Sequence, residues 1–207
     1  MKPTMSHDTL PPITRLAVTA DFSLRADPWE DPELDLVRTY RIAVMAESGR
    51  GDDDDEELQV GTIHIDFMRF DVALNLGFDP EEIADNASHD AITIYEALQE
   101  DLGRMSYGMN QDCLMVSHFS FEPPYRGTTA ELGALRAALI GLSSGVSRAF
   151  LPMGVVIPDI SLATAKDLNA TALYFDKIGF KPLKLGSDIL WLDMEASSFW
   201  RRQASSQ

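Results

Sequence analysis

The run CLMVSHFSFEPPYRGTT, residues 113–129, carries the strongest structural signal in this chain. Its first nine residues predict a β-strand with two alternating faces, formed by Leu114, Val116, His118 and Ser120 on one side and by Met115, Ser117, Phe119 and Phe121 on the other. Because both faces are largely apolar, we expect this strand to be central in a sheet. The Pro-Tyr-Arg-Gly turn at 124–127 then leads into a helix predicted over 129–150.

The remainder of the second half alternates between strands and helices. The spacing of apolar residues predicts a short buried strand at 153–158, a helix at 164–178 and two strands at 180–185 and 188–194. Helices that alternate with strands indicate a mixed α/β sheet covered by helices on both faces.

The first half predicts a hairpin followed by helices. Strands are expected at 13–19, 36–46 and 58–70, and the last two form a long antiparallel hairpin around the acidic run 51–57. Apolar residues three or four apart then predict a helical insertion at about 71–103. We therefore expect a single domain over 13–195, with a flexible N-terminal arm at 1–12 and a C-terminal tail at 196–207.

The composition excludes several classes of protein. With 207 residues, of which 45% are hydrophobic, the chain can bury a full-sized core. It lacks a run of about 18 apolar residues and the apolar core of a signal peptide, so we expect a cytoplasmic protein without a membrane partner. A single cysteine, Cys113, excludes an internal disulfide, and His7, His64, His89 and His118 lack metal-ligand spacing. We expect no structural metal.

The whole chain has a formal net charge of −16, and its acidic side chains are concentrated in the first part. Residues 1–112 hold 25 acidic and 8 basic side chains, whereas residues 113–207 hold 8 acidic and 9 basic ones. An acidic surface repels phosphates, so we expect no nucleic-acid partner. The acidic part either confers solubility or attracts a cationic substrate, and the nearly neutral part can tolerate an anionic cofactor.

Two motifs in the second part indicate a binding site. In the turn at 124–127, backbone N–H groups and the amino end of the next helix point to one spot, where a pyrophosphate can bind. The sequence NATALYFDKIGF, residues 169–180, predicts a helix that is closed by Gly179 and followed by a strand. Over about residues 110–194 the chain resembles the GCN5-related N-acetyltransferase (GNAT) superfamily, and ALYFDKIGF is the most specific part of the resemblance.

The resemblance implies a GNAT-like sheet that opens as a V and holds acetyl-CoA, or another acyl-CoA, between two strands as co-substrate. It implies cofactor contacts by Ser120, Phe121, Arg126, Gly127, Thr128, Thr129 and Asn169. It also implies a general base at Glu122 and a general acid at Tyr174, which protonates the leaving thiolate. The structural alternatives are an exposed strand-end carboxylate for Glu122 and a half-buried packing residue for Tyr174.

The sequence departs from the family pattern in both motifs. Thr129 and Glu131 stand where the phosphate loop of the family has small residues, and Thr128 to Glu131 has the spacing of a helix capping box. In the tail motif Phe175 occupies the tyrosine position of the family, and Tyr174 comes one residue earlier.

These features predict an acyl-CoA-dependent N-acyltransferase that acts on an amine of a small cationic molecule or of a protein. The alternative is a catalytically degenerate GNAT-like binding or interaction module, which the altered loop and the displaced tyrosine favour. An unrelated enzyme that uses the same cleft is a third interpretation, and a homodimer is left open. If the acidic part has a functional use, the acceptor should be cationic and part of the acceptor side should be formed by Asp66, Asp85, Asp90 and Glu96.

Overall fold

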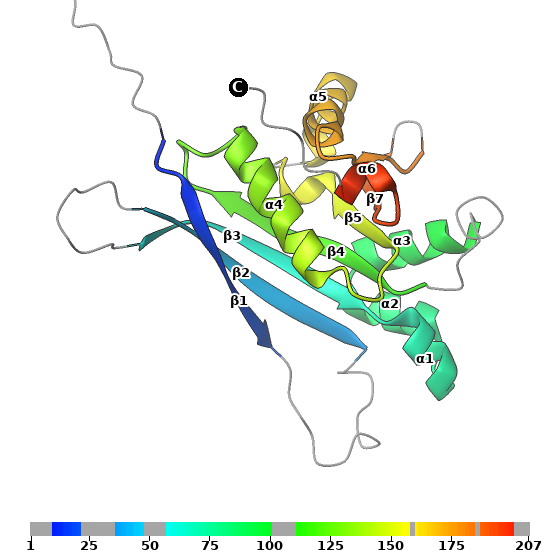
Figure 1. Ribbon diagram of the computed structural model, residues 1–207. Coiled ribbons are helices and arrows are strands. Elements are labelled where there is room, and N and C mark those ends of the chain that lie inside the picture. Colours follow the sequence, from blue (N-terminus) through cyan, green and yellow to red (C-terminus); the bar gives the residue numbers. More distant parts are fainter. Residues whose placement is uncertain are drawn as a thin grey trace, which may run out of the picture.

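One mixed sheet runs through the described part of the chain, with the strand order β1-β2-β3-β4-β5-β7-β6 (Figure 1). The computed structural model describes residues 10–21, 36–47, 57–100, 111–157, 160–184 and 187–200. The strands are β1 (Ile13–Asp21), β2 (Val37–Glu47), β3 (Glu57–Met68), β4 (Cys113–Phe121), β5 (Arg148–Pro152), β6 (Lys181–Pro182) and β7 (Ile189–Asp193). The helices are α1 (Phe70–Leu76), α2 (Pro80–Ala87), α3 (His89–Glu100), α4 (Thr129–Leu142), α5 (Ala165–Asp176) and α6 (Ser197–Trp200), with short 3-10 helices η2 (Met153–Val155) and η3 (Ile160–Leu162).

Neighbouring strands of this sheet are antiparallel except for β4 and β5, which are parallel. Parallel neighbours require a crossover connection, and α4 provides it. The predicted hairpin of β2 and β3 and the central position of β4 are confirmed. The fold is the mixed, GNAT-like α/β fold that the sequence predicts.

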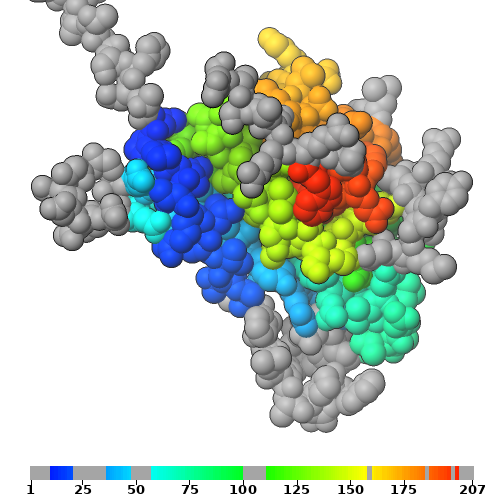
Figure 2. Space-filling view, in the orientation of Figure 1, coloured from blue at the N-terminus to red at the C-terminus, as the bar shows by residue number. Residues whose placement is uncertain are grey.

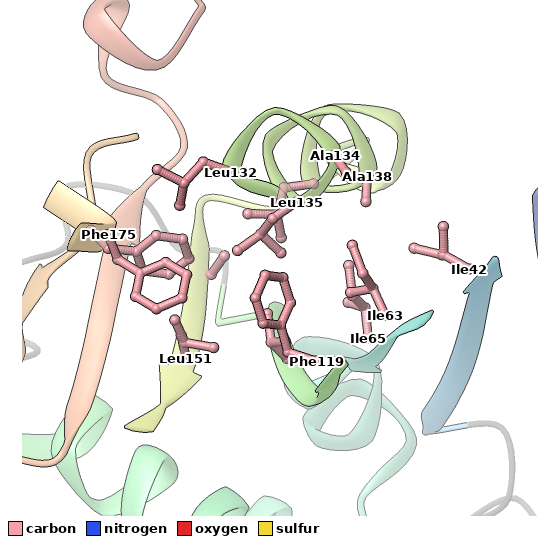
Figure 3. Close-up of a cluster of buried hydrophobic side chains, with 14 of the residues drawn as sticks. Ile42, Ile63, Ile65, Phe119, Leu132, Ala134, Leu135, Ala138, Leu151 and Phe175 are labelled. Atoms are coloured by element: carbon pink, nitrogen blue, oxygen red, sulfur yellow. The ribbon is translucent and has the colours of Figure 1, made fainter. Parts of the chain in front are cut away.

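Helix α4 covers one face of the sheet. Its residues Leu132, Leu135 and Ala138 point toward the sheet: Leu132 lies on the side of Phe175, Leu135 above Phe119 and Ala138 on the side of Ile63 (Figure 3). Phe175 of α5 belongs to the same cluster, which we call the α4 core. Figure 2 shows this side of the molecule, with β1 along one border.

The insertion predicted at 71–103 is helical as far as the structure describes it, and it covers the opposite face at one end of the sheet. Ile94 and Leu98 of α3 pack there against Met68 of β3 and Cys113 of β4. Because side chains alternate along a strand, these positions face away from α4.

Strand β4 contains a β-bulge that changes the predicted alternation of its faces. Its register against β3 shifts around Ser117, which is the extra residue. The residues of β4 that pack in the α4 core are Leu114, Val116, Phe119 and Phe121. The prediction that His118 and Ser120 share the face of Leu114 is therefore wrong, because the bulge inverts the alternation beyond it.

The helix predicted over 129–150 is shorter than expected. It ends at Leu142, and β5 occupies residues 148–152. Between them Gly145 has φ +79°, a left-handed conformation that does not continue a helix. The strand predicted at 153–158 begins instead with η2, because the apolar run after residue 148 has no periodicity that would distinguish a helix from a buried strand.

Several predicted segments lie partly outside the described residues: positions 1–9 of the arm, 51–56 of the acidic run and 201–207 of the tail. In the described part of the tail, α6 brings Phe199 into the α4 core. No helix in the described ranges is long and apolar enough to cross a membrane.

Gly61 of β3 lies under the ring of Phe121, and a Cβ atom at this position would stand 2.6 Å from the Cδ1 atom of that ring. Phe121 is buried and packs against Phe119, with ring centroids 5.1 Å apart, so the ring has little room to move. We predict that Gly61→Ala lowers the free energy of unfolding by about 1–3 kcal/mol, measured by chemical denaturation.

Gly133→Ala is the matched control, because Gly133 is exposed on α4 and an added Cβ meets no atom within 4 Å. This substitution should raise the free energy of unfolding by about 0.5–1 kcal/mol, since alanine favours a helix over glycine. Equal effects of the two substitutions would contradict the close contact at Gly61.

Candidate active site

A cleft forms where β4 and β5 separate. The two strands pair only over residues 113–115 and 148–150. Beyond Met115, β4 bulges at Ser117 and stays paired with β3, while β5 ends at Pro152, which has no N–H group to continue a ladder. Within the described chain, one edge of β4 therefore has no strand partner beyond Met115.

A cavity of about 560 Å³ lies in this opening. Its walls come from the end of β4, the turn before α4, the segment after β5 and one side of α5. The lining residues are Phe119, Ser120, Phe121, Arg126, Gly127, Glu131, Gly154, Val155, Val156, Ala170, Thr171, Tyr174 and Phe175. A wall that combines aromatic and aliphatic side chains with charged and hydroxyl groups is typical of a small-molecule site.

The turn before α4 is closed by Glu131. Gly127 has φ +72°, which a glycine adopts readily, and its N–H donates to the Glu131 carboxylate. The Thr128 hydroxyl accepts a hydrogen bond from the Glu131 N–H at 3.4 Å. Of the two hydrogen bonds of the predicted capping box, the one from the Glu131 N–H to the Thr128 hydroxyl is present. The Glu131 carboxylate accepts instead from Gly127, the residue before the cap. A complete capping box lies at the start of α5, between Thr164 and Asp167.

Glu131 and Tyr174 interact at the wall of the cleft. Glu131 is 7% exposed, and burial raises the pKa of its carboxyl although the hydrogen bond from the Gly127 N–H and the nearby Tyr174 hydroxyl oppose the shift. Burial, and then the charge of Glu131, raises the pKa of the Tyr174 phenol. The Tyr174 hydroxyl donates to the Thr128 carbonyl at 2.9 Å, which ties α5 to the turn.

The structure brings part of the predicted site together. The predicted residues that line the cleft are Ser120, Phe121, Arg126, Gly127 and Tyr174. Thr128, Thr129 and Asn169 are not among the lining residues: the first caps α4, the second begins it, and the third is exposed on α5. Phe175, in the tyrosine position of the family motif, is buried in the α4 core, and its ring also reaches the cleft.

Arg126 is fixed to the end of β4. Its Nε donates to the Phe121 carbonyl at 2.6 Å, so the guanidinium satisfies an acceptor that β5 does not reach. The rest of the side chain is exposed at the mouth of the cleft. It places a positive charge beside the turn.

Glu122 lies beside a second, smaller hollow of about 290 Å³ between the start of β3 and the end of β4. The side chain of Glu122 is exposed. Ser120 and Phe121 line both the cleft and the second hollow. The last residues of β4 therefore form a partition between the two spaces.

The sheet face opposite α4 is polar where α3 does not cover it. His64 and His118 face each other there across β3 and β4, with ring centroids 4.8 Å apart. The Thr39 hydroxyl donates to Asp66 at 2.7 Å.

The acidic residues predicted on the acceptor side line neither the cleft nor the second hollow; they are Asp66, Asp85, Asp90 and Glu96. Among the described residues no group of three or more His, Cys, Asp or Glu could hold a metal.

Two walls of the cleft contain residues that were not among the predicted cofactor contacts, although the segment 153–158 was expected on one side of the cofactor. Gly154–Val156, predicted as part of a strand, line the cleft because β5 has already ended. Ala170 and Thr171 line it together with Tyr174 and Phe175, at the spacing of one helix face. That spacing was visible in the sequence, whereas the end of β5 was not.

Comparisons with known proteins identify no relative by sequence: no protein-family model and no curated protein matches this chain. A solved structure described as "The crystal structure of KacTA-DNA complex" aligns with 86% of this chain and 93% of its own, at 11% sequence identity and a TM-score of 0.37. A similarity this weak supports no conclusion about function. The GNAT-like fold rests on the strand order and on the parallel pair of β4 and β5.

The raised pKa of Glu131 predicts a pH-dependent stability. In the unfolded chain the carboxyl ionises near its ordinary pKa of 4.5, whereas in the folded chain it ionises at a higher pH. A rise in pH therefore lowers the free energy of the unfolded state first. The stabilising contribution of this group is complete below pH 4.5 and is lost as the pH rises through the higher folded pKa. We predict that the wild type loses stability relative to Glu131→Gln over this window, in denaturant titrations from about pH 4 to 8.

The same substitution at the exposed Glu122 controls for the general effect of removing one negative charge. A Glu131→Gln variant whose stability follows the wild type at every pH would contradict a raised pKa at this buried position.

Proposed function

We propose that the cleft carries out N-acyl transfer from a pantetheine thioester, of which acyl-CoA is the form that the resemblance implies. The observation that carries this proposal is the open edge of β4 inside a cavity of about 560 Å³. Unpaired N–H and C=O groups at a strand edge can bind the amide groups of an extended arm. The aromatic wall formed by Phe119, Phe121 and Phe175 suits the methylene groups of that arm.

In the proposed reaction the thioester is bound in the cleft and the amine in the second hollow, and the two meet at the end of β4. An amine nitrogen, delivered from the side of Glu122, attacks the thioester carbonyl carbon; the new C–N bond forms and the C–S bond breaks. Glu122 accepts the proton that the ammonium loses, directly or through water. Tyr174, whose phenol holds its proton at neutral pH, protonates the leaving thiolate.

The proposed acceptor is a cationic amine, polyamine-like, aminoglycoside-like or lysine-bearing. Glu122 is the carboxylate at the second hollow, and the net charge of the chain is −16. A field of one sign concentrates ligands of the opposite sign, so the affinity for the acceptor should weaken with salt. This charge also opposes a nucleic-acid acceptor.

A cytoplasmic location completes the proposal and fits the buried thiol of Cys113.

A second candidate function, a GNAT-like module that binds without catalysis, is favoured by the closed turn. The Glu131 carboxylate bonds the Gly127 amide, and the Tyr174 hydroxyl donates to the Thr128 carbonyl rather than into the cleft. Side chains that could serve a ligand are thus bonded within the protein.

Binding and transfer, measured separately, decide between the two functions. A ligand at 100 times its Kd raises the free energy of unfolding by about 2.7 kcal/mol, so the thermal midpoint reports binding of acetyl-CoA or S-acetylpantetheine. A panel of amines, with acylated product detected by mass spectrometry, reports transfer. Binding without transfer supports the non-catalytic module, and the absence of both contradicts either function.

We predict that Glu122→Gln lowers turnover by about 10²–10⁴, as expected for loss of a general base, and leaves thioester affinity unchanged. The matched control is Glu96→Gln, which removes an exposed carboxylate of α3 that lines neither space. Wild-type turnover in Glu122→Gln would show that water or another group takes the proton.

We predict that Tyr174→Phe also lowers turnover, and that a donor with a more acidic thiol restores much of the rate, because its leaving group needs no proton. The substitution removes the hydrogen bond to the Thr128 carbonyl and should cost about 0.5–1.5 kcal/mol of stability. Equal rate losses with acidic and ordinary thiol donors would assign Tyr174 a structural role only.

A further inference from the structure

The turn before α4 is a poor fit for the diphosphate of CoA, because two of its amides are already bonded within the protein and a buried carboxylate lies beside them. A diphosphate at a helix amino end is bound by free backbone N–H groups. Here the Gly127 N–H donates to the Glu131 carboxylate, and the Thr128 N–H donates to the Tyr125 carbonyl at 3.3 Å. Both amides are therefore bonded within the protein.

Glu131 is held in this position from several sides. Its backbone N–H is bonded to the Thr128 hydroxyl at 3.4 Å, and its side chain is buried at 7% exposure. Tyr174 closes the same turn from α5 through its hydrogen bond to the Thr128 carbonyl. The carboxylate thus fills the position where a phosphate would bind, with contacts from two helices.

The cleft provides little positive charge to offset this carboxylate. Among the described residues that line it, Arg126 is the only basic one, and its Nε is bonded to the Phe121 carbonyl. A diphosphate placed against Glu131 brings like charges together, an arrangement that selective interfaces use to exclude the wrong partner. The aromatic walls and the open edge of β4, in contrast, suit an uncharged arm of amides and methylenes.

We infer that Glu131 is a specificity-determining residue that excludes a diphosphate, so that the acyl donor is a pantetheine-type thioester that places no diphosphate at this turn. This inference rests on the proposed acyl transfer and names its donor. Such a thioester exists as a free small molecule or as the prosthetic arm of a carrier protein, whose single phosphodiester carries less charge than a diphosphate.

Calorimetric titration of the full chain with pantetheine, 4′-phosphopantetheine and CoA tests the inference, because the three ligands share one arm and only CoA adds a diphosphate, together with its phosphorylated adenosine. The wild type should bind pantetheine at least as tightly as CoA. Glu131→Ala removes the charge and frees the Gly127 amide, and it should raise the affinity for CoA relative to pantetheine by at least about tenfold. Glu131→Gln, which keeps the shape of the side chain, should raise the ratio of CoA affinity to pantetheine affinity by a smaller factor.

Glu96→Gln, an exposed carboxylate away from the cleft, should leave the ratio unchanged. Tighter binding of CoA than of pantetheine by the wild type would overturn the inference, since Glu131 would then leave the turn. An unchanged ratio in both Glu131 variants would overturn it as well. If no ligand binds to the wild type or to either variant, the proposed function itself fails.

A fourth ligand, a carrier protein that bears the pantetheine arm, distinguishes the two sources of the thioester. Binding tighter than that of free pantetheine assigns the donor to a carrier protein. Weaker binding assigns it to a free thioester.

Discussion

Three paired residues hold β4 against β5, and the separation of the two strands beyond Met115 creates the cleft. The sequence enforces this separation on both strands. Ser117 adds a residue to β4 that bends the strand away, and Pro152 removes the N–H group with which β5 could continue the ladder. A longer pairing would close the cavity and bury the edge of β4, so the binding capacity of the fold depends on a ladder that stops early.

The turn before α4 shows how one side chain can replace a ligand. A helix amino end leaves N–H groups without partners, and they must be satisfied by side chains, water or a bound anion. Here Glu131 supplies the anion from within the helix, at the cost of burying a carboxylate. The same fold can therefore keep the shape of a cofactor cleft while the electrostatics of its entrance are changed by a single residue.

The sequence predicts the order and direction of most elements, because their signals are local. The alternation in β3 and helix α5, which ends at Asp176 shortly before the left-handed Gly179, both follow from residue spacing. The bulge at Ser117 has no local signal, since β4 is apolar on both faces and a shift by one residue leaves its composition unchanged. The apolar run that contains β5 hides a strand boundary in the same way.

The candidate site is less predictable than the fold. The predicted members that meet at the cleft come from the end of β4, from the turn before α4 and, in the case of Tyr174, from α5. The spacing of Thr128 and Glu131 indicated a helix cap, but the amide that the carboxylate reaches depends on the left-handed Gly127. Such a contact depends on the path of the backbone, which residue types alone do not specify.

The partition formed by Ser120 and Phe121 separates two spaces with a wall only one strand thick. Phe121 lies directly against Gly61, so a side chain added at Gly61 must displace the ring that lines both spaces. A substitution of Ser120 or Phe121 that changes the cleft therefore also changes the second hollow. If both spaces bind substrates, such a substitution alters the selectivity for both partners at once.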